Sequence, residues 1–296
     1  MIKKLVAPYT APVLAAISFL VLLPNQCHST TVVVIINNNG IVIASDSKIA
    51  PVGLGEAKYG RKVLIIKDRI AIAGLGDEAF SFDTPSTHVI DYEFATWVHS
   101  FEGSLPASAS LNDVVHIVDN KFQQMIPRLN FVIASGGMQP NDPVDRFEPY
   151  MKYLVAGYQD GRPVLSVEEF YIDWKAKNVP EPTIHPEADD NIDWHTRMHF
   201  YGVTQALTNL GNRNSYAHKR IMTLCPKAFQ DYISRRPISF NETIDLARAL
   251  VRIEEETNPN EVGGDVRIVH ILPSGRASDL VNDLSKPKRP AQQGKQ

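Results

Sequence analysis

The chain contains little cysteine, with only Cys27 and Cys225 among its 296 residues. Cys27 lies in a leading segment that we expect to be removed, and the one cysteine left cannot form an internal disulfide bond. The fold must then be stabilised by its hydrophobic core, for which a hydrophobic content of 44% is ample. Cys225 fits a small buried apolar residue better than a reactive thiol.

The chain also lacks an excess of charge of either sign, since 30 basic residues stand against 33 acidic ones. A formal net charge of −3 creates no field that would attract nucleic acid or anionic lipid, so we expect neither as a partner. Two short glycine-containing turns, at residues 53–55 and 74–76, do not complete a nucleotide-binding fingerprint. The histidines and acidic residues between positions 185 and 199 lack the spacing of a tight metal site. We therefore expect no metal and no organic cofactor.

The first 29 residues are typical of an export signal, because two lysines precede the apolar stretch at residues 5–23. Small residues at Cys27 and Ser29 favour cleavage between Ser29 and Thr30, which would leave Thr30 as the first residue. The protein would then be periplasmic or secreted. The alternative is a membrane anchor, since residues 5–23 approach the length that spans a bilayer, although Pro8 and Pro12 weaken it.

The periodicity of apolar residues after the signal predicts strands, helices and again strands and helices in one domain over residues 30–284. Strands are expected at 31–37, 41–45, 62–68, 69–74, 152–157, 163–172, 199–203 and 265–272, and helices at 77–101, 111–131, 215–233 and 238–257. Turn residues at 37–40 and at Asp160-Gly161 predict that the strands on either side of each turn form a hairpin. Residues 175–193 are expected to form an exposed loop, and residues 285–296 a disordered tail. This order predicts an α+β fold, a four-layer αββα sandwich of two antiparallel sheets between helix layers.

A threonine at the start of a chain can combine two chemical roles. Its hydroxyl is a weak nucleophile, but its own α-amine, with a reference pKa of about 7.7, can accept the hydroxyl proton at neutral pH. Such a site needs a nearby cation to keep the amine unprotonated, and a carboxylate to hold that cation. Lys62 and Asp46 are the candidates for these roles.

Two stretches carry a family resemblance: residues 30–34, TTVVV, and residues 39–48, NGIVIASDSK. They resemble the opening of a proteasome β subunit, a member of the N-terminal nucleophile (Ntn) hydrolase superfamily. Asp46 and Lys62 follow Thr30 by sixteen and thirty-two residues, which matches the family's catalytic aspartate and lysine without insertion or deletion. The resemblance implies a threonine-type hydrolase that cleaves peptide or other amide bonds.

Further matches extend the resemblance along the chain. Residues 70–74, IAIAG, resemble a family strand whose final glycine contributes its amide to the oxyanion hole, which implies Gly74, with Gly76 as the alternative. Ile49, Gly60 and Leu64 match positions that line the family's specificity pocket, and imply that an apolar side chain is accepted. Residues 262–266, VGGDV, resemble the Ser-Gly-Gly turn that leads into the last long strand.

The chain departs from the family beside the nucleophile. Val262 replaces a serine, and Pro259 stands at the position of a supporting aspartate. Asn258 or Asn260 can substitute for the aspartate, and Thr204 weakly matches another supporting serine.

These departures leave a second hypothesis open, a non-catalytic proteasome-like subunit that assembles into a homo-oligomer or with relatives. Ser29 also replaces the family's usual glycine before the threonine, which favours signal peptidase over self-cleavage. If the first 29 residues are retained, the free amine does not form, and a membrane-anchored scaffold is the third hypothesis.

Overall fold

The computed structural model describes residues 30–49, 58–76, 79–80, 92–135, 147–179, 183–186 and 195–280. The predicted signal segment and the predicted tail lie outside these ranges. Within them, no helix has the length and apolar character needed to cross a membrane.

The first sheet is antiparallel and has the strand order β12-β1-β2-β13-β14. Its strands are β1 (Thr31–Asn37), β2 (Gly40–Ser45), β12 (Arg197–Gly202), β13 (Arg267–Ile271) and β14 (Ala277–Asp279). The predicted hairpin of β1 and β2 is confirmed, with Asn37 opposite Gly40. Gly40 has a φ of 131°, and a Cβ there would lie 2.2 Å from the carbonyl oxygen of Ile271, so the turn requires glycine.

The second sheet is also antiparallel, with the order β11-β10-β9-β6-β5. Its strands are β5 (Val63–Ile66), β6 (Ile70–Gly76), β9 (Phe147–Gln159), β10 (Arg162–Asp173) and β11 (Thr183–Pro186). Asp160 and Gly161 both have positive φ, and they form the predicted hairpin turn between β9 and β10. Strand β11 corrects the prediction of a loop over residues 175–193, because its backbone pairs with the edge of β10. Two short ribbons join β3 (Lys48–Ile49) to β4 (Lys58–Tyr59) and β7 (Ala79–Phe80) to β8 (Tyr92–Glu93).

The helices are shorter than the sequence periodicity predicted. They are α1 (Phe94–Glu102), α2 (Leu111–Gln123), α3 (Ile126–Ala134), α4 (Tyr216–Leu224), α5 (Pro226–Ile233) and α6 (Phe240–Thr257), with a 3₁₀ turn η1 (Leu207–Asn209). Two predicted helices are each divided in two, with Pro127 and Pro226 in the first turn of the second part. Proline cannot donate a backbone hydrogen bond and clashes with the preceding turn, so each helix restarts there. The helix predicted from residue 77 begins only at Phe94, after the β7–β8 pair.

Serines define the starts of two helices. Ser110 and Ser239 each accept a hydrogen bond from the third helical amide and form capping boxes with Asp113 and Glu242. Ser110 is therefore the cap of α2. Ser239 has the same role in α6.

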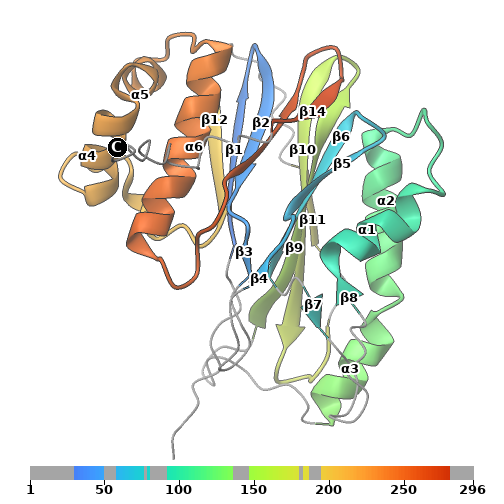
Figure 1. The fold of residues 1–296 in the computed structure, drawn as a ribbon. Coiled ribbons are helices and arrows are strands. Elements are labelled where there is room, and N and C mark those ends of the chain that lie inside the picture. The colour runs from blue at the N-terminus through green and yellow to red at the C-terminus, as the bar shows by residue number, and fades with distance from the viewer. Residues whose placement is uncertain are drawn as a thin grey trace, which may run out of the picture.

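Three buried clusters establish the order of layers. One lies between α1–α3 and the second sheet, one between α4–α6 and the first sheet, and one between the facing sheets. Figure 1 shows the same order, with helices on the outer side of each sheet. The protein is therefore an α+β structure in which two antiparallel sheets pack between helices.

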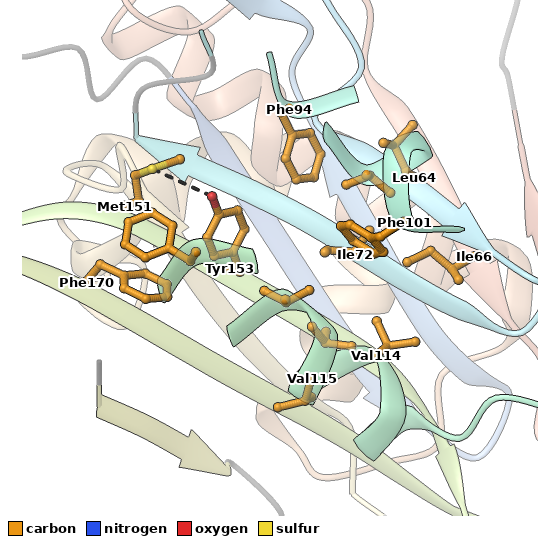
Figure 2. Close-up of a cluster of buried hydrophobic side chains, with 14 of the residues drawn as sticks. Leu64, Ile66, Ile72, Phe94, Phe101, Val114, Val115, Met151, Tyr153 and Phe170 are labelled. Carbon is orange, nitrogen blue, oxygen red and sulfur yellow. Dashed lines mark hydrogen bonds between the residues drawn. The ribbon is translucent and has the colours of Figure 1, made fainter. Parts of the chain in front are cut away.

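The cluster beneath α1 and α2 is rich in aromatic rings (Figure 2). The rings of Phe122 and Phe170 lie 3.6 Å apart between centroids, and the Tyr153 hydroxyl contacts the sulfur of Met151 at 3.6 Å. A Cβ at Gly74 would lie 2.7 Å from the ring of Phe94, so glycine at this point of β6 lets α1 approach the sheet.

Candidate active site around Thr30

Thr30 immediately precedes β1 and is held against the end of β12. Its carbonyl oxygen accepts the Val203 amide hydrogen at 2.8 Å, and the Thr31 hydroxyl donates to the Val203 carbonyl oxygen at 2.6 Å. Gly202 has a φ of 80°, and a Cβ there would lie 1.8 Å from the Thr30 carbonyl oxygen. The approach of these two segments therefore depends on glycine at position 202.

Asp46 and Lys62 form a buried ion pair beside Thr31. The Lys62 Nζ lies 3.2 Å from both carboxylate oxygens of Asp46, and their side chains are 1% exposed or less. The Thr31 amide donates to Asp46 Oδ1 at 2.9 Å. This amide belongs to the peptide bond between Thr30 and Thr31, so the ion pair lies next to Thr30. The structure thus brings together the three residues that the sequence spacing selected.

Burial is the largest influence on the Asp46 carboxyl group, and it raises the pKa above its ordinary value. The Lys62 ammonium and the amides of Thr31 and Gly263 act in the opposite direction, because they stabilise the charged carboxylate. A buried carboxylate and a buried ammonium in direct contact compensate each other's lost hydration. The pair can therefore supply a fixed positive group beside Thr30.

The turn before β13 completes the surroundings of Asp46. The Gly263 amide donates to Asp46 Oδ2 at 3.2 Å, and the Gly263 carbonyl oxygen accepts hydrogen bonds from the amides of Ser47 and Lys48. The Lys48 ammonium donates to the Pro259 carbonyl oxygen at 2.5 Å. Val262 is fully buried, so it provides no polar group where the resemblance would place a serine hydroxyl.

A cleft of about 430 Å³ opens at Thr30. Its walls come from the ends of β6, β9 and β12 and from the turn before β13, through Leu75, Gly76, Tyr150, Met151, Lys152, Gly202, Val203, Thr204, Gln205, Thr208 and Glu261. A volume of this size lies in the range of small-molecule and peptide side-chain sites.

The two glycines proposed for the oxyanion hole differ in position. The Gly74 amide donates to the Lys62 carbonyl oxygen at 3.1 Å, so it is engaged between β6 and the residue before β5. Gly76 lines the cleft and has a φ of 101°; a Cβ there would lie 2.4 Å from the Tyr150 carbonyl oxygen. The structure therefore favours Gly76, the sequence alternative, as the glycine beside Thr30.

Of the three predicted specificity residues, Gly60 and Leu64 are not among the described residues that line this cleft. Gly60 donates its amide to the Ser47 carbonyl oxygen at 2.9 Å. Leu64 is 5% exposed and packs in the cluster beneath α1 (Figure 2). The backbone of Ile49 pairs with Lys58, and its side chain lies outside the description. Their assignment to a substrate pocket stays a prediction.

Thr204, Asn258 and Asn260, the polar residues proposed to support the nucleophile, differ in their position relative to the cleft. Thr204 lines the cleft, whereas Asn260 is exposed on the turn. Asn258 donates through Nδ2 to Glu254 at 2.5 Å, and the Glu254 carboxylate accepts the amides of Ala206 and Leu207. Asn258 therefore stabilises the loop after β12 and does not replace an aspartate in the cleft.

Glu261 and Lys152 also line the cleft, and sequence reasoning missed both. Lys152 forms an ion pair with Glu169, and its ammonium lies 5.6 Å from the centroid of the Tyr201 ring. Glu261 directly precedes Val262 in the turn that resembles the family pattern. That adjacency was the one available signal, but it did not indicate the direction of the side chain.

The described residues contain no group of three or more histidine, cysteine or acidic side chains that could hold a metal ion. Of the histidine-rich segment, residues 187–194 lie outside the description. The chain matches no protein-family model, and no curated protein sequence matches it at a significant level.

Proposed function

We propose that this protein is a threonine-type N-terminal nucleophile hydrolase with a proteasome β-like αββα fold. Cleavage between Ser29 and Thr30 by signal peptidase during export would generate the active form. The observation that carries the proposal is the buried Asp46–Lys62 pair, whose carboxylate accepts the amide hydrogen next to Thr30, a residue that lines a cleft. Titratable groups with perturbed pKa values cluster at functional sites, and burial raises the pKa of Asp46.

The proposed chemistry needs a free Thr30. In the full-length chain the Thr30 nitrogen belongs to the peptide bond with Ser29, and the residue is 1% exposed. After cleavage, the new α-amine accepts the hydroxyl proton, and the Thr30 oxygen attacks the amide carbonyl carbon of the substrate. The leaving amine takes that proton and departs, leaving an ester on Thr30. Water then hydrolyses the ester and restores the hydroxyl group.

The surrounding groups support the two charged species of this sequence. The Lys62 ammonium lowers the proton affinity of the neighbouring amine and stabilises the forming alkoxide. The Gly76 amide, at the wall of the cleft, is our choice of donor to the oxyanion. Peptide bonds are the substrate by resemblance alone, and other amides fit the same chemistry.

Sequencing of the mature N-terminus, together with the intact mass, tests the first step. A start at Thr30 is expected. The mature protein should hydrolyse amide substrates, Thr30→Ser should retain part of that activity, and Thr30→Ala should abolish it. A mature protein that starts at another residue, or a Thr30→Ala variant with unchanged activity, would refute the proposal.

A non-catalytic assembly subunit is the second candidate. It is favoured by the buried apolar side chain of Val262 and by Pro259, whose carbonyl oxygen is occupied by Lys48. Under this hypothesis native mass spectrometry shows a defined oligomer that forms equally well with Thr30→Ala, and amide substrates remain intact. The membrane-anchored scaffold differs from both in that residues 1–29 are retained.

A further inference from the structure

Among the described residues that line the cleft around Thr30, Glu261 carries a carboxylate that the proposed chemistry does not use. This residue is partly buried. Within the part of the chain that the structure describes, its carboxylate has no hydrogen bond or ion pair. A charged group held at the wall of a cleft without a partner is available to a ligand.

The position of Glu261 is fixed relative to Thr30 by a shared partner. The Gly263 amide binds one oxygen of Asp46 at 3.2 Å, and the Thr31 amide binds the other at 2.9 Å. The turn that carries Glu261 and the peptide that follows Thr30 are therefore anchored to the same carboxylate. Thr30 and Glu261 also line the same cleft, so a substrate whose amide bond lies against Thr30 shares that cleft with Glu261.

The nearby cations are already engaged. Lys152, on the same cleft, pairs with Glu169, and Lys48 donates to the Pro259 carbonyl oxygen. Glu261 thus supplies a negative charge that no described lysine or arginine neutralises by direct contact. Such a site favours a cation and disfavours an anion, because like charges are costly in a partly desolvated cleft.

We infer that Glu261 is a specificity residue that selects amide substrates carrying an ammonium or guanidinium group close to the scissile bond. The inference that such substrates are cleaved rests on the proposed function. The substrate can also carry the apolar side chain that the sequence predicts for the specificity pocket, because Gly60 and Leu64 are not among the described residues that line this cleft.

The kinetic test uses the mature protein and three fluorogenic peptide amides that differ only by lysine, norleucine or glutamate beside the scissile bond. For wild type, kcat/KM should fall in that order. Glu261→Gln should lower kcat/KM for the lysine substrate roughly ten- to hundredfold and leave the norleucine substrate nearly unchanged. Glu261→Lys should invert the order. Glu256→Gln, which removes a carboxylate that pairs with Arg220 outside the cleft, is the matched control and should keep it.

A binding test separates this inference from the proposed function. Fluorescence polarisation of labelled hexapeptides with a central lysine, norleucine or glutamate is measured on the full chain carrying Thr30→Ala, with and without Glu261→Gln. Preference for lysine that disappears with Glu261→Gln supports the inference even if the mature protein proves inactive. Equal binding of the three peptides, no binding of any, or hydrolysis without charge preference would overturn the inference, and the last result would leave the hydrolase proposal standing.

Discussion

The buried carboxyl group of Glu168, on β10, should make the stability of the protein depend on pH. Glu168 lies opposite Tyr153 on β9, and its side chain is fully buried. Phe170 and Ile172, two and four residues further along the strand, pack in the cluster beneath the helices, so Glu168 shares their face. Among the residues that the structure describes, neither of its carboxylate oxygens has a hydrogen-bond partner. Burial, with a smaller contribution from Asp119 on α2, raises the pKa of Glu168 to about 8.

The raised pKa makes stability depend on pH with a defined sign. In the unfolded chain the carboxyl group loses its proton near pH 4.5, whereas the folded protein retains the proton up to about pH 8. Because the folded state binds more protons in this interval, the free energy of unfolding falls as pH rises from 4.5 to 8. A shift of this size corresponds to about 5 kcal/mol at most, at 1.36 kcal/mol per pH unit.

The variant Glu168→Gln removes the titration and keeps the volume. Wild type and variant should have similar stability at about pH 5, and the variant should be more stable by roughly 2–5 kcal/mol at about pH 8. Urea denaturation followed by tryptophan fluorescence at several pH values measures this difference. Asp119→Asn should lower the Glu168 pKa slightly, and so narrow the pH range over which the free energy of unfolding falls. Parallel curves for wild type and Glu168→Gln across the interval would refute the reasoning.

Three further predictions follow from the site and its supports. Asp46→Asn leaves the Lys62 ammonium buried without its counter-charge, so urea denaturation should show that the free energy of unfolding falls by about 3 kcal/mol. Adding Lys62→Met should restore much of this stability, while the single and the double variant should both lack hydrolase activity. Full activity in either variant would contradict the proposed site. Burial lowers the pKa of His270, so as the pH falls the unfolded chain binds a proton at this residue before the folded protein does. The melting temperature should therefore fall as the pH drops below about 6.5, and His270→Gln should reduce this dependence. Equal dependence of the melting temperature on pH in wild type and His270→Gln would contradict the prediction. Gly76→Ala should lower the free energy of unfolding by about 2 kcal/mol or more, because Gly76 has a positive φ and a Cβ there would meet the Tyr150 carbonyl oxygen. Gly103→Ala is the control and should change stability little, since the space around its Cβ is open. Equal denaturation midpoints for these two variants would contradict the prediction for Gly76.

The hairpins were predictable because their signals are local. The turn before Gly40 and the turn at Asp160 and Gly161 combine residues that tolerate positive φ with β-branched or apolar runs on both sides. The helix breaks at Pro127 and Pro226 also had a local signal, since proline interrupts the hydrogen-bond ladder. The apolar periodicity continued through both prolines, and the prediction gave it too much weight.

The sequence alone determined the candidates for the reactive site, since the spacing of Thr30, Asp46 and Lys62 is a property of the chain. Only the tertiary structure decided which groups surround them. The choice between Gly74 and Gly76 depends on the hydrogen bond that the Gly74 amide donates to the Lys62 carbonyl oxygen. The position of Glu261 in the cleft depends on the hydrogen bond between Gly263 and Asp46, which are 217 positions apart. Residue types and local periodicity carry no information about such partners, because the partners are chosen by the packing of the two sheets against each other.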